Sequence, residues 1–231
     1  MSAQSDIHPS ILIFWSFALP LLPILVGTLT SSIKVSLVLG MLRNSFGVQG
    51  VPGKMVEFAI SLGITIFVMT PVFHEMQRLP EWTVLSSTST NSVTFSQVDK
   101  LSIPWRNFLF RNTGIREFSF VKSLRKKNSE ELVEKGTTGG EKQQLNDEPS
   151  NLAIDVLVPS FILSELNGGF KMGFSILLPF LVLDLIVANL LIGLGLSMVS
   201  PTLMAFPLKV ILFIAVDGWM LVTKGLILSY S

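Results

Sequence analysis

The sequence predicts an all-α membrane protein of two helical hairpins, about four hydrophobic helices in total, joined by a mostly helical or disordered polar insert. Hydrophobic residues make up 49% of the 231 residues and charged residues 14%, and the mean hydropathy is +0.60. This composition is typical of membrane proteins. The positions of the polar residues divide the chain into a tail at 1–10, a first hairpin at 11–76, an insert at 77–151 and a second hairpin at 152–231.

The first hairpin is predicted from two uncharged stretches. Residues 11–33 carry no charge but contain two prolines, so we expect a kinked helix that packs against other helices. The apolar run continues past Lys34. A loop with several glycines and a proline follows at 43–54, and residues 58–73 predict the second span.

The insert holds most of the chain's charges. Its residues 104–124 place apolar side chains roughly on one side of a helix, which we expect to be interrupted near Thr113 and Gly114. Residues 128–151 are polar, rich in glycine and free of aromatic side chains, and we expect this part to be flexible.

The second hairpin contains the most apolar segment. Residues 152–171 keep near-helical spacing but are too polar for a lipid-facing span, whereas 172–201 hold one charge, Asp184. Their apolar side chains favour insertion by about −7 kcal/mol, against roughly +3 kcal/mol for a central Asp. We therefore expect this segment to insert. The last helix, 202–223, carries two charges and a proline, and we expect it to need partners.

Seven charged residues lie within or beside the hydrophobic segments. Such groups mark an ion or proton pathway, or they form interhelix or intersubunit salt bridges that fix an assembly. The near balance of their signs favours salt bridges, neutralised by neighbouring helices or copies. The residues are Lys34, Glu57, Glu165, Lys171, Asp184, Lys209 and Asp217.

Several functional classes find no support in the sequence. The two histidines lie far apart, and neither an HExxH motif nor a P-loop occurs. The absence of cysteine excludes disulfides and thiolate metal sites. A net charge of +1 gives no reason to expect nucleic acid. We therefore expect no enzyme, no cofactor and no metal.

The short loops predict the orientation in the membrane. Arg43 and Lys54 flank the first turn and Lys209 lies beside the second, so both turns should face the cytoplasm. Four crossings then place the insert and both termini outside. The segment before the first apolar run lacks the basic region of a signal peptide, so we expect that run to be retained.

The turn after the longest apolar segment has two interpretations. Gly193, Gly195, Met198 and Pro201 are small packing and loop residues, as membrane hairpins often have, or they form a constriction. In the second case the flexible side chain of Met198 closes around variable cargo. The residues themselves leave both interpretations open.

Ordered motifs in both hydrophobic halves resemble a known family. The stretch PSFILSELNGGFKMGFSILLPFLVLDLIVANLLIGLGLSMVSP, followed by FPLKVILFIAVDGWMLVTKGLI, is similar to the signature of the R/P-type export-apparatus subunit of bacterial type III secretion. This subunit is SctR in injectisomes and FliP in flagella. KVSLVLGMLRNSFGVQGVPGKMVEFAISLGITIFVMTPVF resembles the N-terminal half of that family, and the insert is similar only around FLFRNTGIREFSF. The ending KGLILSY resembles the SctR branch.

The resemblance implies a core channel-forming subunit of the export apparatus in the bacterial inner membrane, with insert and termini in the periplasm. Several copies, a pentamer in the family, would assemble with S-type and T-type subunits into an entry portal for unfolded secreted proteins. The U-type switch and V-type export-gate subunits are further expected partners. The rival hypotheses are an ion- or proton-coupled transporter that uses the intramembrane carboxylates, and a scaffold without a pore.

The resemblance also assigns roles to particular residues. Glu165 and Lys171 match the family's SELxxxFK region, where subunit contacts are expected, and Asp184, Lys209 and Asp217 match charged positions in its hairpin.

Before the SP turn, members of that family commonly have a run of methionines, thought to form a gasket. This chain has one methionine there, so the resemblance implies a bulky apolar constriction instead. The implied pore residues are Leu196, Met198 and Val199.

Overall fold

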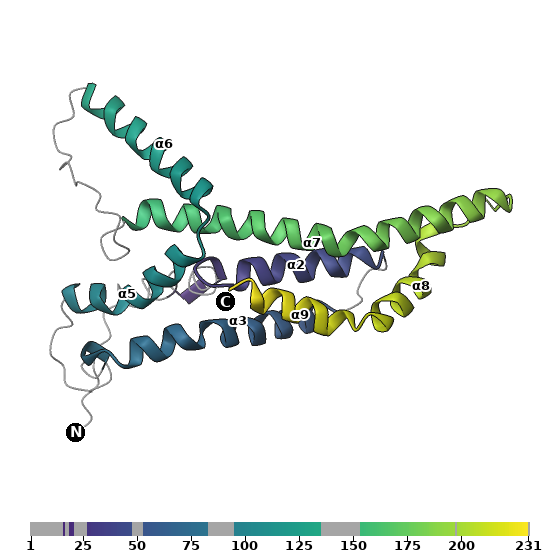
Figure 1. Cartoon of the computed structure of the whole chain (residues 1–231), viewed down its shortest axis with the longest axis horizontal. Helices are drawn as coiled ribbons and strands as arrows, with labels where there is room; N and C mark the ends of the chain where they lie inside the picture. Colours follow the sequence, from purple (N-terminus) through teal and green to yellow (C-terminus); the bar gives the residue numbers. More distant parts are fainter. Residues whose placement is uncertain are drawn as a thin grey trace.

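The computed structural model describes residues 16, 19–20, 27–47, 53–82, 95–134, 153–196 and 198–230. Within these ranges every regular element is a helix, which confirms the all-α class (Figure 1). Two helices are long and apolar enough to cross a membrane, α3 (Lys54–Gln77) and α7 (Ile154–Gly193), and a bent pair of helices makes a third candidate. The predicted tail, most of the predicted helix at 11–33 and the part of the insert beyond Glu134 lie outside the described residues.

Helix α2 (Ser32–Ser45) packs on both α7 and α3 and forms the centre of the bundle (Figure 1). Its Val35, Val38, Leu39 and Leu42 are buried, at the spacing that places apolar side chains on one side of a helix. A Cβ atom on Gly169 of α7 would lie 2.9 Å from a methyl group of Leu37, so the glycine allows the two backbones to approach closely.

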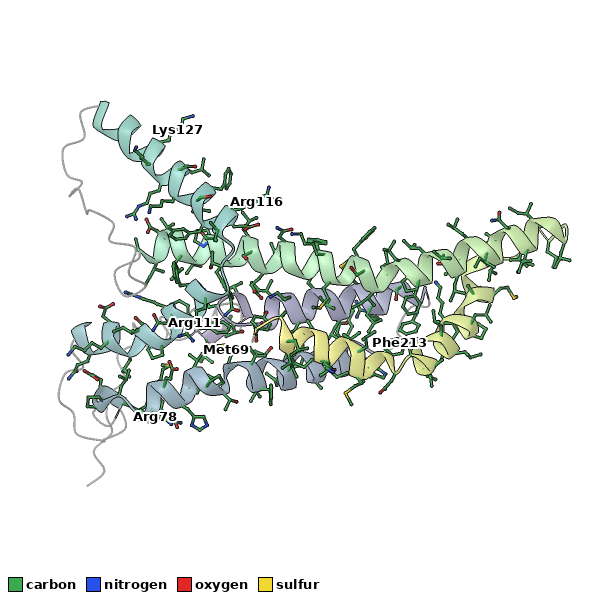
Figure 2. All side chains as sticks on the ribbon, in the orientation of Figure 1. Met69, Arg78, Arg111, Arg116, Lys127 and Phe213 are labelled. Atoms are coloured by element: carbon green, nitrogen blue, oxygen red, sulfur yellow. The ribbon has the colours of Figure 1, made fainter. Side chains whose placement is uncertain are left out.

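The described part of the insert consists of two helices, α5 (Phe95–Arg111) and α6 (Ile115–Glu134). They are separated at residues 112–114, where the sequence predicted an interruption. Helix α6 diverges from the bundle, and Figure 2 shows Arg116 and Lys127 on its outer side. The insert therefore contributes one helix that packs on α3 and one that contacts α7 before it projects away.

Helix α7 runs for 40 residues without a break, so the polar stretch and the apolar span predicted as separate pieces form one helix. It accommodates Pro159 and Pro179 within its length. The polar side chains before Met172 are accommodated because one side of this stretch packs on α2 and the insert. The helix ends at Gly193, several residues before the predicted end at the Ser-Pro turn.

The predicted last helix is two helices, α8 (Pro201–Ala215) and α9 (Gly218–Leu228), bent by 62°. Asp217 at the bend has φ 51°, which makes it the one non-glycine residue with positive φ among the described residues. A Cβ on Gly218 would overlap the ring of Phe213, so glycine is needed there. The bend directs α9 back towards the middle of the bundle (Figure 1).

Candidate functional site

The first buried ion pair joins α2 to α7. Lys34 Nζ lies 3.0 Å from Glu165 Oε1, and the two side chains are 9% and 1% exposed. A Cβ on Gly168 of α7 would lie 3.2 Å from Cε of the lysine, so the absence of a side chain there leaves room for it. An unpaired charge at this depth would be strongly unfavourable, and the pair therefore fixes which sides of the two helices meet.

Tyr230, just beyond α9, completes this cluster. Its hydroxyl donates to Glu165 Oε2, and the carbonyl oxygen of Ser31 lies 3.2 Å away as a second acceptor. Its ring lies 4.1 Å from Lys34 Nζ and stacks on Phe108. Burial, and then the neighbouring carboxylate, raise the pKa of Tyr230 far above its ordinary value, so the hydroxyl remains a donor.

The second buried ion pair joins α8 to α7. Lys209 Nζ lies 2.8 Å from Asp184 Oδ2 and donates to the carbonyl oxygen of Ser45 at 2.8 Å. Ser45 is the last residue of α2, and a helix ends with carbonyl groups that carry partial negative charge. Lys209 is therefore bound by a helix end and a carboxylate together. With Lys34 near the start of α2, charged side chains hold both ends of this helix.

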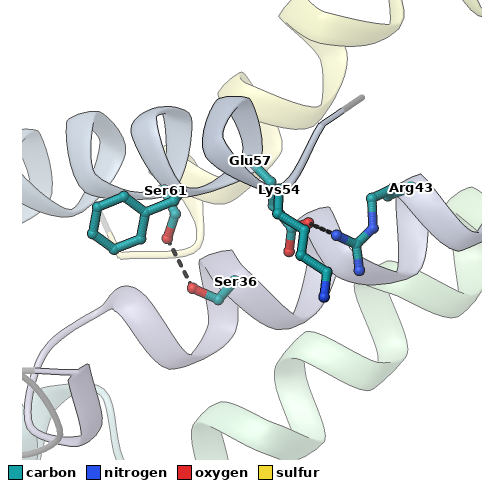
Figure 3. A pocket seen from close by; sticks show the side chains of 6 residues that line it. Ser36, Arg43, Lys54, Glu57 and Ser61 are labelled. Atoms are coloured by element: carbon teal, nitrogen blue, oxygen red, sulfur yellow. Dashed lines mark hydrogen bonds and ion pairs between the residues drawn. The ribbon is translucent and has the colours of Figure 1, made fainter. Parts of the chain in front are cut away.

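A third pair lies beside the turn between α2 and α3 (Figure 3). Arg43 Nη1 lies 2.9 Å from Glu57 Oε2, and the hydroxyls of Ser36 and Ser61 are 2.9 Å apart. These contacts connect the two helices of the first hairpin through polar groups. The open cavity of about 220 Å³ beside them is lined by Ser36, Arg43, Lys54, Glu57, Phe58 and Ser61.

The corner between α5 and α6 is bound by one turn of α7. Ser164 Oγ accepts a hydrogen bond from the backbone N–H of Gly114 at 2.8 Å and donates to the carbonyl oxygen of Asn112 at 3.3 Å. The amide of Asn167 donates to Glu117 Oε1 at 2.8 Å, and this hydrogen bond lowers the pKa of Glu117. The motif SELN therefore supplies polar ties to both the insert and α2.

The predicted pore residues lie in the turn between α7 and α8, at the end of α7 that is far from the α5–α6 corner. Helix α7 and α8 are joined there by residues 194–200, in which Gly195 has φ 76°. Met198 is 100% exposed and Leu196 is 47% exposed, while Val199 is half-buried. The hairpin tip extends past the neighbouring helices and carries exposed apolar side chains (Figure 2).

The structure brings four of the six predicted assembly residues into pairs, Lys34 with Glu165 and Lys209 with Asp184. The other two, Lys171 and Asp217, have exposed side chains. Among the described residues, no group of three or more His, Cys, Asp or Glu side chains is placed to hold a metal ion.

Sequence reasoning missed the polar partners that lack a charge, chiefly Tyr230, Ser164 and Asn167. The last two lie within the quoted SELN motif, which was the only available signal for them. Tyr230 lies in the ending KGLILSY and is the one tyrosine of the chain, but neither observation indicated its partners.

The long apolar helices, tied together by buried ion pairs, define an all-helical membrane protein. The model of the FliP family matches residues 16–226. The chain is 36% identical over 213 residues to the harpin secretion protein HrcR of Erwinia amylovora, with 92% of each chain covered. It is 34% identical over 213 residues to the Yop proteins translocation protein R of Yersinia pestis, again with 92% of each covered.

A third relative, the surface presentation of antigens protein SpaP of Salmonella typhi, is 34% identical over 219 residues, with 91% of each chain covered. The chain belongs to the FliP family, the export-apparatus subunits of type III secretion, and the three relatives named above are injectisome members of that family. Members of this family are non-enzymatic components of protein translocation in the inner membrane.

Proposed function

We propose that this chain is a core channel-forming subunit of the export apparatus, several copies of which assemble into the entry portal for unfolded secreted proteins. In this proposal the tips of the α7–α8 hairpins surround the path. The loop that carries Leu196, Met198 and Val199 narrows it when no substrate is present.

The observation that supports the proposal most strongly is the exposed apolar surface of the second hairpin. Only 11% of the 18-residue apolar stretch of α7 is buried within the chain. The end of the α7–α8 hairpin extends beyond α2 (Figure 1). Exposing apolar surface to water costs about 25 cal/mol per Å². Lipid or other subunits must therefore cover this hairpin, and the family membership supports subunits for part of it.

The ion pairs support a rigid rather than a conducting role for the buried carboxylates. Glu165 is 1% exposed and engaged by both Lys34 and Tyr230, so its oxygens are occupied within the chain. Asp184 is bound to Lys209 through Oδ2 alone, and its side chain is 30% exposed. An ion- or proton-coupled transporter would need at least one of these carboxylates to release its partner.

The arrangement in the membrane follows the predicted topology. We propose two hairpins with four crossings, in which the turns at 43–54 and around Pro201 face the cytoplasm. The insert and both termini then lie in the periplasm. The exposed Lys171 and Asp217 meet opposite charges on neighbouring copies, and S-type and T-type subunits cover the remaining surface. The U-type and V-type subunits are proposed partners on the same grounds.

Purification of the assembled state tests the proposal. The chain is produced with an affinity tag, alone or together with S-type and T-type subunits, and native mass spectrometry counts the copies. A multi-copy complex that contains all three subunits is expected. A chain that remains monomeric with its partners present, and that conducts ions when reconstituted alone, would support the transporter instead.

A further inference from the structure

Helix α9 is attached to the rest of the chain in an unusual way. At its start, Asp217 in the left-handed conformation joins it to α8 at the 62° bend. At its other end, the residues that follow Leu228 return to the first ion pair. Helix α8 has its own attachment through Lys209, on the opposite side of the bend.

Tyr230 supplies most of the polar contacts of the second attachment, and the hydroxyl of Ser229 adds one more by accepting a hydrogen bond of 3.5 Å from Lys34 Nζ. The Tyr230 hydroxyl engages Glu165 on α7 and the carbonyl oxygen of Ser31 at the start of α2. Its ring faces the ammonium group of Lys34 at 4.1 Å. One side chain therefore contacts the carboxylate, the cation and the helix start of the buried cluster. The remaining anchors of α9 are the buried apolar residues Val222 and Leu226.

Apolar contacts alone hold a helix against its neighbours but do not fix its angle to them, because they lack the angular preference of a hydrogen bond. A hydrogen bond to a charged group is both stronger and directional. The charge of Glu165 makes the Tyr230 hydroxyl the strongest directional contact at the far end of α9, because the hydrogen bond from Lys34 to Ser229 is 3.5 Å long. The bend at Asp217 is then the point about which α9 would turn.

We propose that Tyr230 is a positioning residue, which holds α9 at its angle to α8 by binding the Lys34–Glu165 pair. Loss of its hydroxyl lets α9 turn about Asp217, while Lys209 keeps α8 in place. A loosened α9 would support the hairpin tip less firmly in the closed portal. Only this consequence rests on the proposed function.

Distances between spin labels test the inference. The chain contains no cysteine, so labels attach only where cysteine is introduced. The pair Asn44→Cys with Lys224→Cys joins exposed sites on α2 and α9, and the pair Asn44→Cys with Leu208→Cys joins α2 to α8. Both pairs are measured by pulsed electron paramagnetic resonance in the full-length chain in detergent, with doubly labelled copies diluted into unlabelled ones.

The variants separate the hydroxyl from the ring. Tyr230→Phe removes the hydroxyl and keeps the ring, and Tyr230→Ala removes both. Leu228→Ala is the matched control in the same segment, because the side chain of Leu228 is 58% exposed. We expect the narrow α2–α9 distance distribution to be lost in part with Tyr230→Phe and fully with Tyr230→Ala. The α2–α8 distribution should stay narrow throughout, and Leu228→Ala should change neither.

Three results would overturn the inference. They are an unchanged α2–α9 distance in Tyr230→Ala, equal broadening of both pairs in Tyr230→Phe, and broadening in Leu228→Ala as large as in Tyr230→Phe. None of them depends on secretion. The inference can therefore fail while the complex still forms, and the complex can fail to form while the inference stands.

Discussion

Lys209 is the more deeply buried of the two buried lysines, Lys34 and Lys209, among the described residues. Lys209 is 1% exposed, and its ammonium group binds both the carboxylate of Asp184 and the carbonyl oxygen of Ser45. Removing one partner of a buried pair leaves the other charge without compensation, whereas removing both can be nearly neutral. The two changes can therefore be compared directly.

We expect substitutions at Lys209 and Asp184 to have strongly non-additive effects on the free energy of unfolding. Lys209→Met or Asp184→Asn alone should lower the free energy of unfolding by about 2 kcal/mol, less than the ~3–5 kcal/mol of a fully buried pair because Asp184 is 30% exposed. The double variant should lie within about 1 kcal/mol of the unchanged chain. Equilibrium unfolding in detergent micelles measures all three. Simple addition of the two single effects would contradict an energetic coupling between these side chains.

Met198 is the most exposed apolar residue of the hairpin tip. If its side chain helps to close the portal, Met198→Ala removes apolar volume from the constriction, and the closed portal should become more permeable to small molecules. Leakage of a small dye from cells or vesicles that contain the complex measures this. Ile66→Ala is the control, because Ile66 is 56% exposed on α3, away from the tip. Unchanged permeability would remove Met198 from the closure.

At the scale of elements, the bend between α8 and α9 explains the motif FxxxDGW. Asp217 adopts the left-handed conformation, which Asp tolerates better than most residues. Gly218 leaves space for the ring of Phe213, and Trp219 packs edge-on against the same ring at 5.3 Å. Figure 2 shows Phe213 beside this bend. Its ring also contacts Phe46 at the end of α2.

Substitutions at Asp217 separate its backbone role from its charge. Asp217→Asn keeps a residue that tolerates positive φ, so the isolated chain should keep its stability, whereas Asp217→Val should cost about 1–2 kcal/mol. If the carboxylate meets a cation on a neighbouring copy, both variants should lower the yield of the multi-copy complex on native gels. Normal complex formation by Asp217→Asn would rule out the intersubunit charge contact.

We expect a larger side chain at position 218 to overpack the contact between Gly218 and Phe213. Gly218→Ala places a methyl group into the ring of Phe213, which other aromatic rings hold in place, and should cost about 1–3 kcal/mol. Gly63→Ala is the matched control, since Gly63 is exposed within α3 and a Cβ there meets nothing within 4 Å. That variant should be neutral or stabilising by about 0.5–1 kcal/mol. Thermal unfolding of both proteins gives the comparison, and equal effects would contradict a tight contact at Gly218.

The sequence predicted the elements that local patterns define. The interruption near Gly114 follows from a polar Asn-Thr-Gly stretch within an apolar periodicity, and the structure confirms it. The bend at Asp217 was not predicted, because no proline marks it and the apolar pattern continues on both sides. The pairing of Lys34 with Glu165 could not be predicted either, since the spacing of residues in separate helices carries no information about their geometry.

At the scale of the whole molecule, the chain combines a helical bundle that is held by ion pairs and hydrogen bonds with a hairpin tip that lacks such contacts among the described residues. Helix α2 is held at both ends by charged groups, and the described insert helices are bound to α3 and α7. The tip of the second hairpin has no such ties within the described residues, and Met198 is fully exposed there. A rigid base and an exposed apolar tip fit the proposed portal subunit, in which lipid or other subunits would cover the tip.

Site-specific photo-crosslinking to a secreted protein stalled during export tests the central claim most directly. A photoreactive amino acid is placed at Met198, or at Phe73 as a control that is 50% exposed near the end of α3. The proposal predicts a covalent adduct with the stalled substrate from position 198 and none from position 73. Equal yields at the two positions, or no adduct from Leu196, Met198 or Val199 during active export, would contradict a hairpin tip that lines the path of the substrate.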